Sequence, residues 1–243
     1  MKLKAIISTL ALAGSLMLNA TSVNAAPISV VADNFGDITT IGGNTVTFSG
    51  SGIPTNAVNW SDFSDGQGNT LRLGIGATQR FGAPTPTNDG AGTFFVEPGL
   101  DSNGVGLWNF SFFAEIEGQL DIQAINLELL FDLDPMAGTD VASMGVLNIS
   151  NFLVANSLPS TQISEGSQNP TFGFLSVSAP SILTPGALSA FDPNSGEYSF
   201  GISAEGFGSV GINVNVNAVS APSIGIIGAL SIFSLMYLRR RNS

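Results

Sequence analysis

The stretch EYSFGISAEGFGSVGINVNVN, residues 197–217, has the clearest structural pattern in the chain. Residues 209–217 alternate valine or isoleucine with mostly glycine or asparagine, and residues 197–205 alternate Tyr, Phe, Ile and Ala with Glu, Ser and Gly. A period of two is typical of a β-strand with one buried and one solvated face. Gly206-Phe207-Gly208 lies between the two runs and supplies a turn. The stretch therefore predicts a β-hairpin.

The same alternation recurs upstream of this hairpin. Residues 107–116 and 125–133 each place five apolar residues on one face. The shorter strand candidates are residues 28–32, 45–48, 70–75, 93–96, 146–153 and 171–177. Residues 82–92 and 155–170 are polar and predict exposed connections, while residues 140–144 suit one helical turn. Many short strands without alternating helices predict an all-β fold, a single antiparallel β-sandwich or jelly roll.

Two residue types that serve much of enzyme chemistry are missing, because the chain has no cysteine and no histidine. Their absence rules out Ser-His-Asp and Cys-His catalysis and most zinc or transition-metal sites. An exported domain without disulfides must be stabilised by its core or by bound ions. With no other catalytic motif in the chain, the sequence favours a protein that is not an enzyme.

Charge narrows the choice of partners. Of the seven basic residues only Arg72 and Arg80 lie between the two ends of the chain. Two basic against 18 acidic residues give residues 26–218 a net charge of −16. Such a region has no cations to replace phosphate counterions, which excludes nucleic acid as a partner. The acidity favours solubility, or it is the electrostatic basis for binding Ca²⁺.

The N-terminus has the organisation of a secretory signal peptide. Lys2 and Lys4 precede an apolar stretch over residues 5–18, and Val23-Asn24-Ala25 provides a cleavage site. We expect a signal peptide over residues 1–25, with cleavage after Ala25 or, as the next choice, after Ala26. The alternative is a retained anchor, which the short apolar core disfavours.

The C-terminus combines three features in order: Val219-Ser220-Ala221-Pro222, an apolar run from Ser223 to Leu238, and Arg239-Arg240-Arg241. A helix over the apolar run would be about 24 Å long, slightly shorter than a hydrocarbon core of about 30 Å. The arginines would stop transfer and remain cytoplasmic, which leaves residues 26–218 as an ectodomain on the other side. An ordinary permanent C-terminal anchor has the same hydropathy pattern and stays open as an alternative.

This tail, on a chain with a signal peptide, resembles the PEP-CTERM family of Gram-negative bacteria. In that family a proline-containing motif, a short transmembrane segment and an arginine cluster are recognised by an exosortase. The corresponding positions here are Val219 to Pro222, Ser223 to Leu238 and Arg239 to Arg241, a sorting signal over residues 219–243. The chain departs from the usual Val-Pro-Glu-Pro motif, because its motif lacks the acidic residue. The resemblance implies delivery from the inner membrane to the cell surface or to the extracellular polysaccharide matrix, and hence a connection to biofilm.

The most suggestive acidic residues for a binding site are Asp132 and Asp134, with Asp140 close behind. Residues two apart on a strand face the same side, so both carboxylates could reach one cation or one sugar hydroxyl. Asp132, Asp134 and Asp140 are therefore a candidate Ca²⁺ site. Ca²⁺ takes about 6–8 oxygen ligands, so three acids are few, and a solubilising strand end followed by a turn is the favoured alternative. Residues 62–69 resemble a fragment of a calcium loop, but an Asx-rich turn is favoured there too.

The two tryptophans are candidates for stacking against a sugar. Trp108 lies on the apolar face of its predicted strand, which indicates a core position, whereas Trp60 lies in a turn-rich region. Trp60 is therefore the better candidate for an exposed ring.

The residues leave three functions open. The first is a non-enzymatic surface or matrix protein, sorted by an exosortase-like enzyme and associated with exopolysaccharide. The second is a carbohydrate- or Ca²⁺-dependent binding module on the same scaffold. The third and least favoured is a glycoside-active enzyme, since no pair of carboxylates is singled out among 18 acids.

Overall fold

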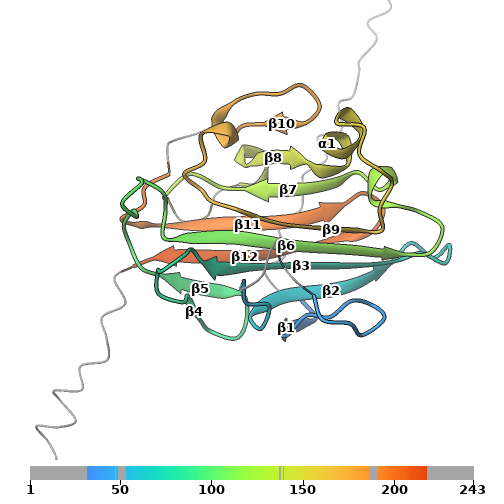
Figure 1. Ribbon diagram of the computed structural model, residues 1–243, viewed down its shortest axis with the longest axis horizontal. Helices are drawn as coiled ribbons and strands as arrows, with labels where there is room; N and C mark the ends of the chain where they lie inside the picture. Colours follow the sequence, from blue (N-terminus) through green and yellow to red (C-terminus); the bar gives the residue numbers. More distant parts are fainter. Residues whose placement is uncertain are drawn as a thin grey trace, which may run out of the picture.

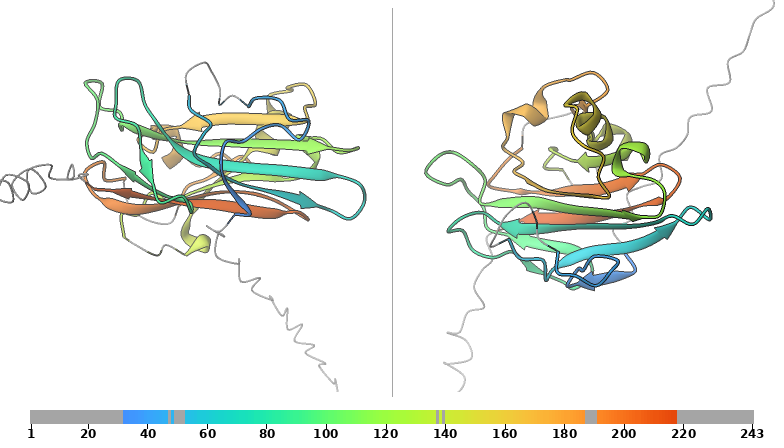
Figure 2. Two further views of the ribbon diagram at one scale, coloured as in Figure 1. Left: turned by 90° about the horizontal axis from the view of Figure 1, so that it is seen from below. Right: turned by 45° about the vertical axis from the view of Figure 1, so that its right-hand side comes forward.

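The computed structural model describes residues 32–46, 48, 53–136, 138, 140–186 and 191–217, which form two β-sheets packed face to face (Figures 1 and 2). The first sheet has the strand order β1 (Asn34–Gly36), β2 (Val58–Ser64), β3 (Thr70–Gln79), β6 (Trp108–Glu117) and β9 (Ile163–Gln168). The second has the order β10 (Leu183–Thr184), β8 (Gly145–Asn148), β7 (Leu127–Phe131), β11 (Gly196–Ala204), β12 (Gly208–Val216), β5 (Thr93–Val96) and β4 (Thr87–Asn88). The described residues include one α-helix, so the prediction of an all-β fold is confirmed.

The predicted hairpin over residues 197–217 is confirmed and lies inside the second sheet. β11 and β12 pair in antiparallel register from Gly196↔Val216 to Ala204↔Gly208. β7 pairs antiparallel with the other side of β11, while β5 pairs parallel with the other side of β12. The hairpin is therefore central to the sheet, and its alternating apolar face is buried against the first sheet.

Aromatic contacts between the sheets form the centre of the core. The ring of Phe110 on β6 stacks on Phe200 of β11 with 4.4 Å between centroids, and Trp108 meets Phe200 edge-on at 5.7 Å. All three side chains are at most 2% exposed. Edge-on and stacked pairs add to the stabilisation that burial alone gives. The core position predicted for Trp108 is confirmed.

Four tight connections share one five-residue pattern, which begins with Asp or Thr and has glycine in fourth place. They are Thr40–Asn44, Asp65–Asn69, Asp89–Thr93 and Asp101–Val105. In each, the first residue donates its N–H to the fifth carbonyl and accepts the fifth N–H on its side-chain oxygen. Each fourth-place glycine has a positive φ, between 75° and 98°, which side chains disfavour. These aspartates therefore have a structural role in the turns.

The outer face of the first sheet is covered by the segment before β2. Ile38, Val46 and Phe48 of this segment pack with Val58 and Phe113 into a second buried cluster. We call this region the covered face. It extends the apolar packing beyond the space between the sheets.

Arg72 fixes this covering segment. Its guanidinium donates to both carboxylate oxygens of Asp62 at 2.7 Å and to the backbone carbonyls of Thr39 and Thr40 at 2.8 and 2.9 Å. Arg72 is only 9% exposed, and the carboxylate of Asp62 compensates its charge in these mostly buried surroundings. The hydrogen bonds that Arg72 donates to the Asp62 carboxylate raise the pKa of Arg72, and they outweigh burial, which opposes the charged form.

The predicted strand over residues 146–153 is wrong in its second half. β8 ends at Asn148, and α1 (Ile149–Ala155) begins directly after it. The side-chain oxygen of Asn148 accepts a hydrogen bond from the N–H of Asn151 at 2.7 Å, which caps the helix. The cap therefore overrides an apolar pattern that also suits a strand.

The predicted strand over residues 171–177 is wrong as well, because η3 (Gly173–Ser176) occupies that stretch. Asn169, fully buried, donates to the carbonyls of Gly106 and Trp108 and accepts the N–H of Thr171. These bonds turn the chain away from the sheet immediately after β9. Elsewhere, the helical turn expected over residues 140–144 is confirmed as η2 (Val141–Ser143).

Candidate functional site

The three predicted calcium ligands lie in turns after β7. β7 ends at Phe131, so Asp132 and Asp134 do not lie on a strand as expected. An oxygen of Asp132 accepts the N–H of Asp134 at 2.8 Å, Asp134 accepts that of Met136 at 3.1 Å, and Asp140 accepts that of Ala142 at 3.2 Å. Within the described residues no cluster of three acids is arranged to hold a metal ion. Calcium binding at these residues stays a prediction.

The loop after β2 is an Asx-rich turn, as favoured from the sequence. Asp65 accepts the N–H groups of Gln67 and Asn69 at 2.7 and 3.1 Å. The side-chain amide of Asn69, followed by the N–H of Gln67, lowers the pKa of Asp65. Asp62 points to Arg72 instead, so the two acids do not converge on one ligand.

Trp60 is partly buried and its ring is in contact with Arg72. The guanidinium carbon of Arg72 lies 4.5 Å from the centroid of its ring, a cation–π contact. Trp60 also packs against the buried cluster of the covered face. One face of the ring is thus used within the chain, and the stacking role proposed for an exposed Trp60 has no support from this arrangement.

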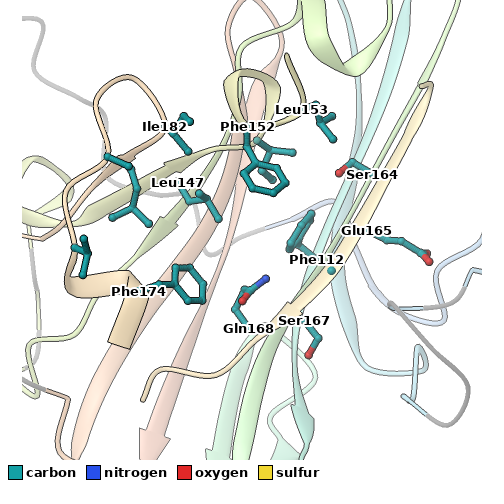
Figure 3. Close-up of a pocket in the computed structure, with 15 residues that line it drawn as sticks. Phe112, Leu147, Phe152, Leu153, Ser164, Glu165, Ser167, Gln168, Phe174 and Ile182 are labelled. Carbon is teal, nitrogen blue, oxygen red and sulfur yellow. The ribbon is translucent and has the colours of Figure 1, made fainter. Parts of the chain in front are cut away.

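A cavity lies between the two sheets at the edge formed by β9 (Figure 3). Its volume is about 540 Å³. Phe112 of β6 lines it from the first sheet, and Leu147 of β8 and Leu183 of β10 line it from the second. We call this region the β9 cavity. At this edge the sheets do not close on each other as they do around Phe110 and Phe200.

Strand register explains why β9 leaves this space. Ser164, Gly166 and Gln168 lie opposite Ala114, Phe112 and Phe110 of β6. Residues directly opposite in an antiparallel pair face the same side, and these β6 residues belong to the central core. The inward positions of β9 are thus hydroxyl, glycine and amide, where a closing strand would carry large apolar side chains.

Gly166 is required by the ring of Phe112. A Cβ atom built at Gly166 would lie 2.6 Å from Cε1 of Phe112, closer than real contacts. Because Gly166 has no side chain, the ring of Phe112 can lie against the β9 backbone and line the cavity. The glycine therefore gives the cavity an aromatic surface on the side of the first sheet.

The opposite wall is built from chain that leaves the sheets. α1 contributes Phe152, and the segment around η3 contributes Phe174 and Val177. The side-chain amide of Asn151 donates to the carbonyl of Ser181 at 2.8 Å, which ties α1 to the segment before β10. Phe152, Phe174 and Val177 are 44%, 45% and 61% exposed, so this wall presents apolar surface to solvent at the mouth.

The β9 cavity is apolar and carries no cation. Ten of its 15 lining residues are apolar, and the other five are the consecutive residues 164–168 of β9. Glu165 is the one charged residue of the lining, and its carboxylate is directed away from the cavity in Figure 3. The two basic residues of the described chain, Arg72 and Arg80, pair with Asp62 and Asp101 elsewhere.

Sequence reasoning missed this site. Residues 155–170 were expected as a polar connection, yet they contain β9. The signal that could have found it is weak, because residues 163–168 are polar apart from Ile163 and Gly166 and show no apolar alternation. The sequence patterns predicted no strand over residues 58–64 either, although β2 forms there, next to the covered face.

The sorting residues Val219 to Pro222 and Arg239 to Arg241 lie outside the described residues, as do the signal peptide and most of the predicted strand over residues 28–32. No helix within the described ranges has the length and apolar character needed to cross a membrane. Comparison of the chain with protein-family models, curated proteins and solved structures gave no match. The resemblance of the tail to an exosortase signal therefore stays a prediction.

Proposed function

We propose that this chain is an exported, non-enzymatic protein of the bacterial cell surface or extracellular matrix, delivered through its C-terminal signal. The observation that carries the proposal is the order of elements at the end of the chain. β12 ends at Val216, and the motif Val219 to Pro222, the apolar run and the arginines follow directly. A folded domain that reaches to within a few residues of such a tail suits delivery of the domain as a unit.

The proposed ectodomain is one β-sandwich, jelly-roll-like, over residues 26–218. Its negative charge supports a location away from the anionic membrane surface, since its only basic residues are Arg72 and Arg80 and both form ion pairs. An anionic lipid surface or a nucleic acid would be repelled. Neutral exopolysaccharide is compatible with this charge and is the proposed surrounding matrix.

The proposed partner is an exosortase-like enzyme that acts while the apolar run from Ser223 to Leu238 lies in the inner membrane of a Gram-negative bacterium. Positively charged residues after an apolar segment favour the cytoplasmic side. Arg239 to Arg241 would therefore hold the tail in place until the ectodomain is released.

Intact mass combined with fractionation of the native host tests this proposal. A product that lacks both the signal peptide and the residues after about Pro222, recovered from the surface or medium, is the expected result. Changing Arg239, Arg240 and Arg241 together to Ala should abolish that product. A product that keeps residues 223–243 in the membrane of the unaltered strain would instead establish a permanent anchor.

The triple change of the same arginines to Lys is the matched control. Lysine keeps the positive charge and the topology but loses the planar guanidinium. Normal release with Lys and loss with Ala would assign the effect to charge, whereas loss with both would assign it to recognition of arginine. Both of these results are compatible with sorting. Release of the product from the triple Ala variant as from the unaltered protein would contradict a role for the arginine cluster.

A further inference from the structure

The β9 cavity has the size and shape of a ligand site. Its volume of about 540 Å³ falls within the range of about 300–1,000 Å³ that is usual for small-molecule pockets. It lies between the layers, with walls on both sides, so it is suited to enclose a small molecule (Figure 3). A flat patch would suit a protein partner better.

The lining is not what chain packing alone would give. Protein interiors are normally close-packed, and voids larger than a water molecule are few. Here Phe112 and Ile149 are 5% exposed at the inner end, while Phe152 and Val177 at the mouth are 44% and 61% exposed. A continuous apolar surface that runs from the core to solvent is costly unless a ligand or partner covers it.

The polar wall indicates what one end of the ligand must offer. The hydroxyl of Ser164 and the amide of Gln168 are on the inward side of β9, and neither side chain hydrogen-bonds another group in the part of the chain that the structure describes. The Gln168 amide is directed into the cavity in Figure 3. An amide offers both a donor and an acceptor, so it can bind a hydroxyl or a carbonyl group.

Charge excludes ionised ligands. A carboxylate or phosphate in the cavity would be buried without a cation, because the lining contains none and the region carries a net charge of −16 from two basic and 18 acidic residues. A cation would lack a counter-charge too, because the Glu165 carboxylate faces away. An uncharged ligand avoids both costs.

We propose that the β9 cavity binds an uncharged amphiphile, a molecule with an apolar chain or ring body and one neutral hydrogen-bonding end, of the class of fatty alcohols and acyl esters or amides. The apolar body lies between Phe112 and the wall formed by α1 and η3. The neutral end hydrogen-bonds Gln168 and Ser164. This binding does not depend on the route by which the protein is delivered.

Photolabelling of the full chain in phosphatidylcholine vesicles tests the proposal. The probe is dodecanol that carries a diazirine, and the labelled residues are mapped by mass spectrometry of peptides. Saturable labelling of residues 147–183 is expected. Unlabelled dodecanol should displace it more effectively than dodecanoate at alkaline pH, since only the second competitor is charged.

A matched pair of valines separates the cavity from general exposure. Val177 lines the cavity and is 61% exposed, whereas Val154 does not line it and is 60% exposed. Val177→Ser should lower the apparent affinity for the probe by about threefold, and Val154→Ser should not change it. Equal effects of the two changes would overturn the proposal.

Ser164→Leu gives a second, independent arm. The leucine would enter the cavity from β9 and should reduce labelling by about tenfold, while a melting curve shows whether the fold is kept. Phe81 serves as an internal reference, because it is 97% exposed and does not line the cavity. Labelling that follows exposure, strongest at Phe81 and unchanged in Ser164→Leu, would refute the cavity as a binding site.

Discussion

The covered face and the β9 cavity lie against opposite faces of the same strand, and only one of them is closed. On the outer side of β6, Phe113 is buried under the segment that contains Ile38, Val46 and Phe48. On the inner side, Phe112 faces a cavity of about 540 Å³. The neighbours differ: apolar side chains cover the first ring, and Ser164, Gly166 and Gln168 border the second. Closure is thus decided by which residues the adjoining segment supplies.

The two arginines test how strongly the covered face is fixed. Arg72→Ala would leave Asp62 and two carbonyls without their donor and should lower the free energy of unfolding by about 2–4 kcal/mol. The Arg80 side chain is more exposed than that of Arg72, at 23% against 10%, and its contact with Asp101 is longer, at 3.4 Å, so Arg80→Ala should cost only about 0–1 kcal/mol. Urea unfolding followed by tryptophan fluorescence measures both. Similar losses would mean that Arg72 does not close this face.

Tyr198 of β11 is a buried titratable group in the core between the two sheets. Its hydroxyl donates to the carbonyl of Asp192 at 2.9 Å, and burial raises the pKa of Tyr198 to about 12. Because the folded chain holds the phenol proton more tightly than the unfolded chain, protonated Tyr198 stabilises the fold. This contribution to the free energy of unfolding is fully present below the pKa of an unfolded tyrosine, about 10, and is lost as the pH rises through about 12. The expected loss is about 2–3 kcal/mol between these limits.

Urea unfolding across the same pH interval checks the role of Tyr198. Tyr198→Phe should be less stable at neutral pH, because Asp192 and Ser195 lose hydrogen bonds, but its stability should be flatter in alkali. An unchanged alkaline slope in this variant would assign the titration to another group.

A pair of glycines probes the open side. Gly166→Ala places a methyl group 2.6 Å from Phe112 and should cost about 1–2 kcal/mol, limited by the space into which the ring can move. Gly173→Ala meets nothing within 4 Å and should change the stability by a few tenths of a kcal/mol at most, about the usual size for an open position. Thermal melting of the two variants compares them. A cost at Gly173 equal to that at Gly166 would argue against the close contact with Phe112.

Added Ca²⁺ should change the stability least. If the β9 cavity is the ligand-binding region, excess Ca²⁺ should raise Tm by less than about 1–2 °C. A larger rise that Mg²⁺ does not produce, and that Asp134→Asn removes, would favour the Ca²⁺-dependent binding module instead. Asp65→Asn is the control, because Asp65 accepts backbone hydrogen bonds within its own turn, as Asp134 does, but is not one of the three candidate ligands.

Sequence patterns predicted the fold best where two consecutive strands both alternate between apolar and polar residues. β11 and β12 were predicted because the two faces of the hairpin differ from each other in polarity along its whole length. The patterns failed at Asn148 and Asn169, whose side chains bind backbone groups and redirect the chain. The spacing of apolar residues does not reveal such turns, because each turn depends on the geometry of one polar side chain that binds the backbone.

The candidate site was harder to predict than the fold. Asp132, Asp134 and Asp140 attracted attention as acids at short spacing, but spacing indicates a common face only while the strand continues, and β7 ends at Phe131. The residues that line the cavity carry no chemical signature of their own. Phe112, Phe152 and Phe174 are ordinary apolar residues in the sequence, and their common position depends on how β6, α1 and η3 come together.

The all-β class, the hairpin over residues 197–217, the acidity, and the exclusion of chemistry that needs histidine or cysteine all follow from the amino-acid sequence, because each depends on composition or on local periodicity. Which surfaces are closed depends instead on how distant segments pack. The covered face needs Arg72 to meet a segment more than 30 positions earlier in the chain. The β9 cavity needs register between β6 and β9 to turn Ser164, Gly166 and Gln168 inward. Both depend on contacts between residues far apart in the chain, which local pattern cannot specify.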